Sequence, residues 1–166
     1  KNWKKYSESL EERIGIDQKL MSRVIFQAKK NPKKVVFAEA DNAKVLKAAQ
    51  ICKDEGIAEP ILLGKRERIF SIMEENGLEL QDCVIIDPYE EESKREEFGD
   101  IYYSKRQRRG VSKNQTARIM RDRNYFGSMM VETGEADALI SGLTNEYPKT
   151  IRPALEIIGT EPGVKK

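Results

Sequence analysis

Apolar residues along the chain follow two alternating patterns, which predict strands and helices in turn. Continuous apolar runs of the first pattern occur at 34–40, 60–64, 83–88 and 136–141. Runs of this kind are typical of strands buried on both faces of a parallel sheet. Apolar residues of the second pattern recur with the period of a helix. Strands separated by helical segments of ten or more residues predict an α/β protein with three α/β/α layers and a mostly parallel sheet.

Glycines and capping residues mark where the predicted helices begin and end. Gly56, Gly77 and Gly134 suit helix stops, because glycine adopts the left-handed conformation that follows a helix. Asp17 and Ser112 are suited to cap helix starts. Helices are expected at about 17–30, 42–55, 65–77, 90–108, from 112 onward and at 125–134. Residues 1–15 place Trp3, Tyr6, Leu10 and Ile14 on one helical stripe and predict a short amphipathic lead-in.

Length and charge narrow the class of protein. The chain has 166 residues, of which 35% are charged and 39% hydrophobic, and its net charge is +2. This length fits one domain or a piece of a larger one, and a start at Lys1 suggests an excised segment. The small net charge favours neither a nucleic-acid nor a membrane partner, and no apolar run reaches the ~20 residues that span a bilayer. With no secretory signal, we expect a cytoplasmic protein.

The absence of histidine restricts the chemistry that this chain can perform. Histidine is the commonest general base and the commonest ligand of transition metals, so no metal site is expected. The two cysteines, Cys52 and Cys83, lie far apart in apolar surroundings and favour neither a disulfide nor a zinc site. Catalysis would have to use Asp, Glu, Lys, Tyr, Cys or Ser, or residues outside this chain.

The junction after the last apolar run is the first candidate for a binding site. Ligands of open parallel sheets bind beyond the carboxyl ends of strands, near helix N-termini. Gly142 lets the chain leave the strand, and Thr144 and Asn145 offer short polar side chains for capping or ligand contact. Arg152 follows within a turn or two of the expected helix start, where it could hold a phosphate or carboxylate. The alternative is a surface arginine that pairs with Glu156, four residues later.

A basic run at 105–109 is the second candidate. Such a run is usually a solvated helix face, phosphate recognition is the next interpretation, and nucleic-acid binding is the third. Acidic residues at 90–93 and 96–97 precede the run and could pair with it.

Other features favour ordinary structural roles. Met129 and Met130 fit a core better than a ligand site. Asp41 and Asp87 lie at the ends of predicted strands. Each could be a polar residue of a site or an ordinary cap. No P-loop, GxGxxG, HExxH or GxSxG motif is present.

Two stretches resemble the phosphate acetyltransferase family. They are "YFGSMMVETGEADALISG" (125–142) with "TIRPALEIIG" (150–159), and "KKVVFAEADNAKVLKAAQICKDEGIAEPILLG" (33–64). The family shares the Met-Met-Val, Gly-x-Ala-Asp-Ala, Ser-Gly and Arg-Pro-Ala-Leu-x-Ile-Ile succession. The resemblance covers most of 18–164 and implies an isocitrate/isopropylmalate dehydrogenase-like α/β/α fold.

A narrower resemblance concerns "NEYPKTIRPALEIIG" (145–159) and "YSESLEERIG" (6–15). Both are similar to the phosphotransacetylase-like C-terminal domain of hybrid NADP-dependent malic enzymes. Stand-alone acetyltransferases instead carry small hydroxyl residues and alanine where this chain has Glu146, Tyr147 and Pro148. The resemblance implies that 1–15 leads in from a malic enzyme domain absent from this chain. Residues 16–166 would then be the first part of the phosphotransacetylase-like domain, whose second half is also absent.

The resemblance also implies site residues and ligands. Arg106 and Arg152 match family arginines implicated in binding CoA or phosphate, and Gly142, Thr144 and Asn145 complete the expected site. The ligand would be acetyl-CoA, a related acyl-CoA, or phosphate. The catalytic residues of the family lie in the absent half, so none is assigned here, and NADP and a divalent metal would belong to the malic enzyme domain.

Two functions follow as expectations. The first is a regulatory and oligomerisation domain of an NADP-dependent malic enzyme, which converts malate to pyruvate, with acyl-CoA as effector and a homo-oligomer as the assembly. The second is part of an active phosphate acetyltransferase, which moves acetyl between CoA and phosphate.

Overall fold

Four parallel strands form the centre of the molecule, in the order β3-β2-β1-β4. The computed structural model describes residues 16–161 and 163–164, so the predicted lead-in at 1–15 lies outside it. The strands are β1 (Lys33–Phe37), β2 (Ala58–Leu63), β3 (Val84–Ile86) and β4 (Ala138–Ile140). Val36 of β1 lies beside Ile61 of β2 and Leu139 of β4. The parallel sheet predicted from the apolar runs is confirmed.

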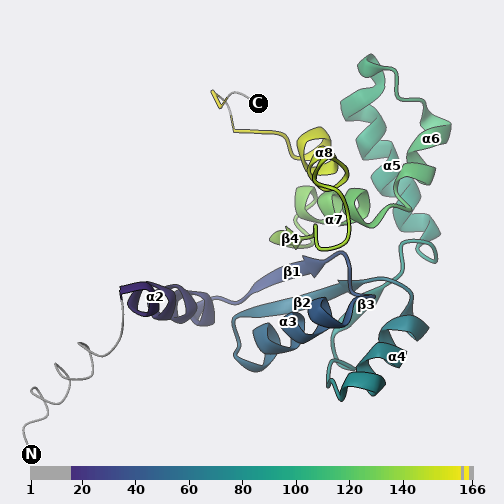
Figure 1. Ribbon diagram of the computed structural model, residues 1–166. Coiled ribbons are helices and arrows are strands. Elements are labelled where there is room, and N and C mark those ends of the chain that lie inside the picture. Colours follow the sequence, from purple (N-terminus) through teal and green to yellow (C-terminus); the bar gives the residue numbers. More distant parts are fainter. Residues whose placement is uncertain (1–15, 162, 165–166) are drawn as a thin grey trace, which may run out of the picture.

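Helices cover both faces of this sheet (Figure 1). The helices of the described chain are α2 (Ile16–Lys30), α3 (Ala43–Asp54), α4 (Arg66–Asn76), α5 (Glu92–Arg106), η1 (Gln107–Arg109), α6 (Lys113–Ile119), α7 (Arg123–Glu132) and α8 (Tyr147–Ile157). Figure 1 shows α3 and α4 on one side of the strands and α5 to α8 on the other. The three-layer α/β/α fold is therefore confirmed.

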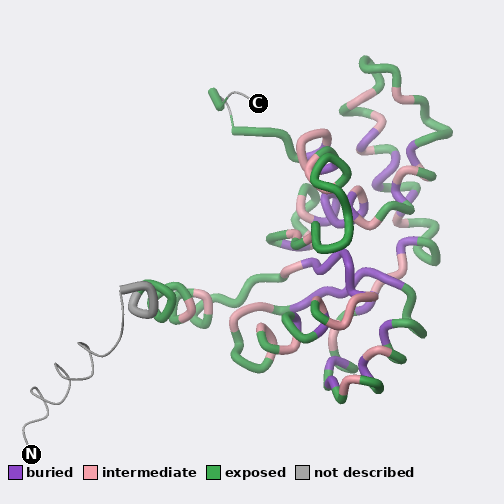
Figure 2. Tube along the Cα trace, in the orientation of Figure 1, coloured by how far each residue is buried: buried purple, intermediate pink, exposed green. Residues whose placement is uncertain are grey.

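Alternating strand residues divide the core between the two faces. Phe37 and Leu62 pack with residues of α3 and α4. Their neighbours Val36 and Ile61 pack with residues of α5, α7 and α8. Because successive strand side chains point to opposite faces, one continuous apolar run supplies both cores. Figure 2 shows the resulting belt of buried residues through β1 and β2.

Several element boundaries differ from the prediction. Helix α7 begins at Arg123 because the Asp122 side chain accepts hydrogen bonds from the backbone N–H groups of Asn124 and Tyr125. The helix predicted over 90–108 ends at Arg106 and continues as the short 3₁₀ helix η1. Pro148 lies in the first turn of α8, whereas Pro153 lies inside that helix.

Helix α7 lies very close to the sheet at Gly127. A Cβ atom at this position would come 2.7 Å from Leu139 Cδ1 and 3.2 Å from Val36 Cγ1. Because glycine has no side chain, α7 can pack this close to β1 and β4. Met129 and Met130 of the same helix are buried, as predicted for core residues.

The chain order creates a switch point between β1 and β4. From β1 the chain adds β2 and β3 on one side, and then returns to add β4 on the other. The segments that follow β1 and β4 therefore separate toward opposite faces, which leaves space at the carboxyl ends of these two strands.

Helix α2 projects away from the sheet, and its described side chains are largely exposed (Figures 1 and 2). Leu20, Met21, Val24 and Phe26 are among them. Within the described part of the chain, no helix is long and apolar enough to cross a membrane.

Candidate functional site

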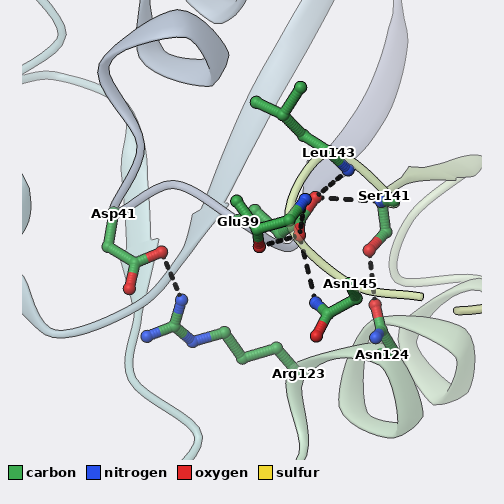
Figure 3. A network of polar contacts seen from close by, with 9 residues as sticks. Glu39, Asp41, Arg123, Asn124, Ser141, Leu143 and Asn145 are labelled. Carbon is green, nitrogen blue, oxygen red and sulfur yellow. Dashed lines mark hydrogen bonds and ion pairs between the residues drawn. The ribbon is translucent and has the colours of Figure 1, made fainter. Parts of the chain in front are cut away.

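Glu39, two residues beyond β1, organises the loop that follows β4. Its carboxylate accepts hydrogen bonds from the backbone N–H groups of Gly142 (2.9 Å), Leu143 (2.7 Å) and Thr144 (2.9 Å). The Thr144 hydroxyl and the Asn145 amide, the latter at 3.0 Å, also donate to it. Figure 3 shows this carboxylate enclosed by the loop. One carboxylate thus satisfies five donors of a segment more than 100 residues away.

These donors keep Glu39 ionised although it is only 5% exposed. Burial by itself would raise the pKa of this carboxyl group. The hydrogen bonds from the Thr144 side chain and from the loop backbone outweigh burial and lower the pKa from 4.5 to about 2. Glu39 is therefore an anion built into the protein.

The predicted residues of the strand-end loop do come together, but around this internal anion. Gly142 adopts a φ of 112°, which favours glycine and turns the loop toward Glu39. The N–H groups of Gly142 and Thr144, and the Asn145 side-chain amide, are the donors that an anionic ligand would have used. In this structure they bind the Glu39 carboxylate.

The two predicted arginines lie elsewhere, around Glu156 of α8. Arg152 Nε donates to Glu156 Oε1 at 2.8 Å, and Arg106 Nη2 lies 3.4 Å from the same oxygen. The first contact is the i to i+4 pair that the sequence offered as the alternative. Arg106 and Arg152, which are 46 positions apart in the sequence, nevertheless meet at a single carboxylate.

Two tyrosines hold the other oxygen of Glu156. Tyr102 and Tyr125 donate their hydroxyl hydrogens to Oε2 at 2.7 Å and 2.8 Å. Burial and the hydrogen bond to Glu156 raise the pKa of both tyrosines, so they stay protonated as donors. Burial alone would raise the pKa of Glu156, but hydrogen bonds from Arg152 and both tyrosines lower it. We call these five residues the Glu156 cluster.

The Glu156 cluster carries more positive than negative charge. Two guanidinium groups face one carboxylate, and both tyrosines are neutral. The Arg106 side chain is 16% exposed and its Nε is buried without a hydrogen-bond partner among the described residues. The Arg152 side chain is 72% exposed and reaches solvent. An oxyanion is the group that would use these remaining donors.

The rest of the basic run is divided between two roles. Lys105 pairs with Glu132 and donates to the backbone oxygen of Ile157 at 2.9 Å. Arg108 and Arg109 are exposed, as expected of a solvated helix face. The acidic residues that precede the run do not pair with it in the described structure, and Lys94 instead contacts Glu97 and Glu135.

A cavity of about 310 Å³ opens at the switch point between β1 and β4. Its lining comes from four segments. These are 38–41 after β1, Tyr89 after β3, 121–124 at and just before the start of α7, and 144–145 after β4. Arg123 Nη1 lies 2.7 Å from Asp41 Oδ1, and Asn124 Oδ1 accepts from the Ser141 hydroxyl at 2.6 Å (Figure 3). We call this space the switch-point cavity.

Sequence reasoning missed Glu39, Arg121, Arg123 and Asn124 as site residues. Glu39 lies inside the apolar run 34–40, which predicts a strand rather than a site. The segment "RDRN" (121–124) carried a usable signal, because aspartate followed by a helical pattern is a capping site and places its neighbours at a helix start. Asp41 was named as a strand-end residue, and it does pair with Arg123 there.

Fold and site together define an α/β protein with a parallel sheet, in which two arginines and one carboxylate meet in the Glu156 cluster. A sequence profile of the phosphate acetyl/butaryl transferase family matches residues 19–166. The chain belongs to this family.

Similar proteins bear this out. A phosphate acetyltransferase of Thermoanaerobacterium thermosaccharolyticum is 37% identical over 146 residues, which is 88% of this chain and 44% of that protein. One from Helicobacter pylori is 41% identical over 138 residues, 83% of this chain and 26% of that protein. A solved phosphotransacetylase from Streptococcus pyogenes is 32% identical, with a TM-score of 0.81, over 92% of this chain and 45% of that one. The chain thus spans less than half the length of the relatives it matches.

Proposed function

We propose that this chain forms one wall of the substrate site of a phosphate acetyltransferase. Acyl-CoA or phosphate would bind at the Glu156 cluster, where Arg106 and Arg152 hold phosphoryl oxygens. In the transfer, a phosphate oxygen attacks the acyl carbon, the C–S bond breaks, and CoA leaves as its thiol. The residues that would act on the departing thiol are not assigned to this chain.

The convergence of Arg106 and Arg152 on Glu156 is the observation that carries this proposal. These are the two arginines for which the sequence resembles family residues that bind CoA or phosphate. A guanidinium fork matches the geometry of phosphate oxygens and remains charged at every relevant pH. Holding the phosphate and neutralising its charge would align it with the acyl carbon and reduce electrostatic repulsion.

The Glu156 carboxylate and both tyrosines would orient the arginines rather than take part in bond making. Each tyrosine has a raised pKa and is engaged as a donor, which makes it a poor base. Glu156 is held at both oxygens and stays ionised. Its role would be to fix the direction of the two forks.

Calorimetric titration of acetyl-CoA into the 166-residue chain tests this proposal. Arg152→Ala should weaken binding about tenfold to a hundredfold, because a charge-assisted bidentate contact is lost. Arg152→Lys should recover only part of the affinity, since it restores the charge but not the fork. Arg68→Gln, an exposed arginine of α4, is the control and should bind like the wild type. Equal affinity of the Arg152→Ala variant and the control would refute the proposal.

A second candidate is the acyl-CoA effector domain of an NADP-dependent malic enzyme. The start of α8 favours it: Tyr147 is 76% exposed, and Pro148 occupies the first turn. Stand-alone acetyltransferases are expected to carry small hydroxyl residues at this place. A bulky side chain at the start of the helix that carries Arg152 would suit binding better than passage of a phosphate to the acyl group.

Two assays separate the candidates. Release of CoA from acetyl-CoA in the presence of phosphate, measured on the full-length gene product, would support the acetyltransferase. Oxidative decarboxylation of malate that responds to acetyl-CoA, with the response weakened by Arg152→Ala, would support the malic enzyme. Homo-oligomer formation and a cytoplasmic location stay predictions under both.

A further inference from the structure

Glu156 is a negative charge fixed beside the two arginines that the proposed function assigns to an anionic ligand. We propose that Glu156 determines the charge selectivity of the Glu156 cluster, because its carboxylate weakens the binding of doubly charged oxyanions more than that of singly charged ones. This inference rests on the proposed function, since it requires that Arg106 and Arg152 hold the ligand. It deepens that function by naming the residue that sets the preferred charge of the ligand.

The Glu156 carboxylate and the ligand would share the same guanidinium groups. Arg152 Nε and Arg106 Nη2 both contact Glu156 Oε1, at 2.8 Å and 3.4 Å. Each guanidinium has five N–H groups, so others remain for a ligand. Because a hydrogen bond joins atoms about 2.9 Å apart, an oxyanion held on these groups would lie roughly 5–7 Å from Oε1. The charge of the ligand and the charge of Glu156 would therefore repel each other.

The fold holds Glu156 in this position. Tyr102 and Tyr125 donate to Oε2 at 2.7 Å and 2.8 Å, so both carboxylate oxygens are engaged. The Glu156 side chain is 11% exposed. Burial would raise the pKa of this group, but hydrogen bonds from Arg152 and the two tyrosines lower it, so the carboxylate stays ionised. The repulsion is therefore a lasting property of the site.

The charges of the cluster do not cancel. Arg106 and Arg152 contribute two positive charges and Glu156 one negative charge, which leaves a net charge of +1. The neighbouring cation, Lys105, pairs with Glu132 and adds no net charge. Glu156 thus halves the positive charge that two arginines alone would present to a ligand.

The expected effect follows from the charge of the ligand, because repulsion grows in proportion to it. Over about 6 Å, with an effective dielectric constant between that of a protein surface and that of water, removing the charge of Glu156 should strengthen binding of a singly charged group about tenfold and of a doubly charged group about a hundredfold. A purely structural role of Glu156 would change both affinities by the same factor. The ratio of the two affinities therefore isolates the effect of charge.

The test compares two phosphate esters that differ in charge. At about pH 8 methyl phosphate carries two negative charges, because the second pKa of a phosphate monoester is about 6, whereas the diester dimethyl phosphate carries one. An NMR titration at constant low salt follows the backbone amide signals of 150–157 in the 166-residue chain. Glu156→Gln should raise the ratio of the two affinities about tenfold. Glu59→Gln, an exposed glutamate of β2, is the matched control and should keep the wild-type ratio.

A second variant makes the test independent of the folding of the first. Glu156→Ser removes the same charge with a shorter side chain, leaves room for water, and should raise the ratio in the same way. A ratio that stays at the wild-type value without the charge overturns the proposal, even if both esters bind more tightly. Failure of the proposed function looks different: the wild type then binds neither ester saturably, or Arg152→Ala binds both as tightly as the wild type, and the inference falls with it.

Discussion

Glu39 and Glu156 are two largely buried carboxylates that the fold satisfies in opposite ways. Glu39 is surrounded by backbone N–H groups, one hydroxyl and one amide, and none of its partners among the described residues is an arginine or lysine. Glu156 contacts two arginines and two tyrosines. The first carboxylate uses up the donors of its loop. The second leaves charged donors that can still bind a ligand.

The difference shows why a strand-end loop is not in itself an anion site. The segment 142–145 has the glycine and the short polar residues that such a site requires, but its donors already bind Glu39, which follows β1. At Glu156 the internal anion is outnumbered by cations. Whether a ligand can bind therefore depends on the donors that remain after the protein has satisfied its own carboxylates.

The largest effect is expected from removing the Glu39 carboxylate. Glu39→Ala should lower the free energy of unfolding by about 3–5 kcal/mol, because several buried donors lose their partner. Chemical denaturation measures this, with Glu59→Ala, an exposed glutamate of β2, as the control. A loss no greater than that of the control would show that the loop does not depend on Glu39.

Glu39 should differ from ordinary carboxylates in the pH range over which its ionised form stabilises the fold. Its pKa is lowered from 4.5 to about 2 in the folded state, so the folded protein holds this proton less tightly than the unfolded chain. Ionised Glu39 therefore stabilises the folded state, and this stabilisation is complete above pH 4.5. As pH falls from 4.5 toward 2, the free energy of unfolding should decrease by about 3 kcal/mol. Glu39→Gln should remove this part of the pH dependence. Denaturation at a series of pH values tests it, and parallel curves for both proteins would contradict it.

A smaller effect should distinguish the two arginines of the Glu156 cluster. Arg106→Gln should cost about 1–2 kcal/mol of stability, since its largely buried guanidinium packs against Glu156. Arg152→Gln should change the melting temperature little, because its side chain is mostly in solvent. Both should weaken acyl-CoA binding. Equal melting temperatures for the two variants would mean that Arg106 is not part of the folded framework.

The smallest effects are expected from the tyrosine hydroxyls. Tyr102→Phe and Tyr125→Phe should each cost about 1 kcal/mol, and the double variant should differ from their sum because both donate to one oxygen. Chemical denaturation of the two single variants and the double variant gives the free energies of unfolding, from which the energetic coupling between the two hydroxyls is calculated. Tyr147→Phe, whose side chain is exposed, serves as the control. Strict additivity would indicate that the hydroxyls do not share Glu156.

The sequence predicts the fold better than the site, for a physical reason. Apolar runs and glycine stops are local, and they locate the four strands and most helix ends, such as Gly77 after α4. The site depends on pairs distant in the sequence: Glu39 with 142–145, Arg106 with Glu156, and Asp41 with Arg123. No local pattern shows which buried carboxylate reaches which loop. The exception is Arg152 with Glu156, whose helical spacing made the contact predictable.

Gly127 brings α7 close to the sheet, and this one helix carries residues of both the switch-point cavity and the Glu156 cluster. Arg123 and Asn124 of this helix line the switch-point cavity, and the next residue, Tyr125, holds Glu156. Side-chain substitutions should therefore perturb one region at a time. A larger residue at 127, which would push the whole helix away from the sheet, should displace the cavity lining and the Glu156 cluster together.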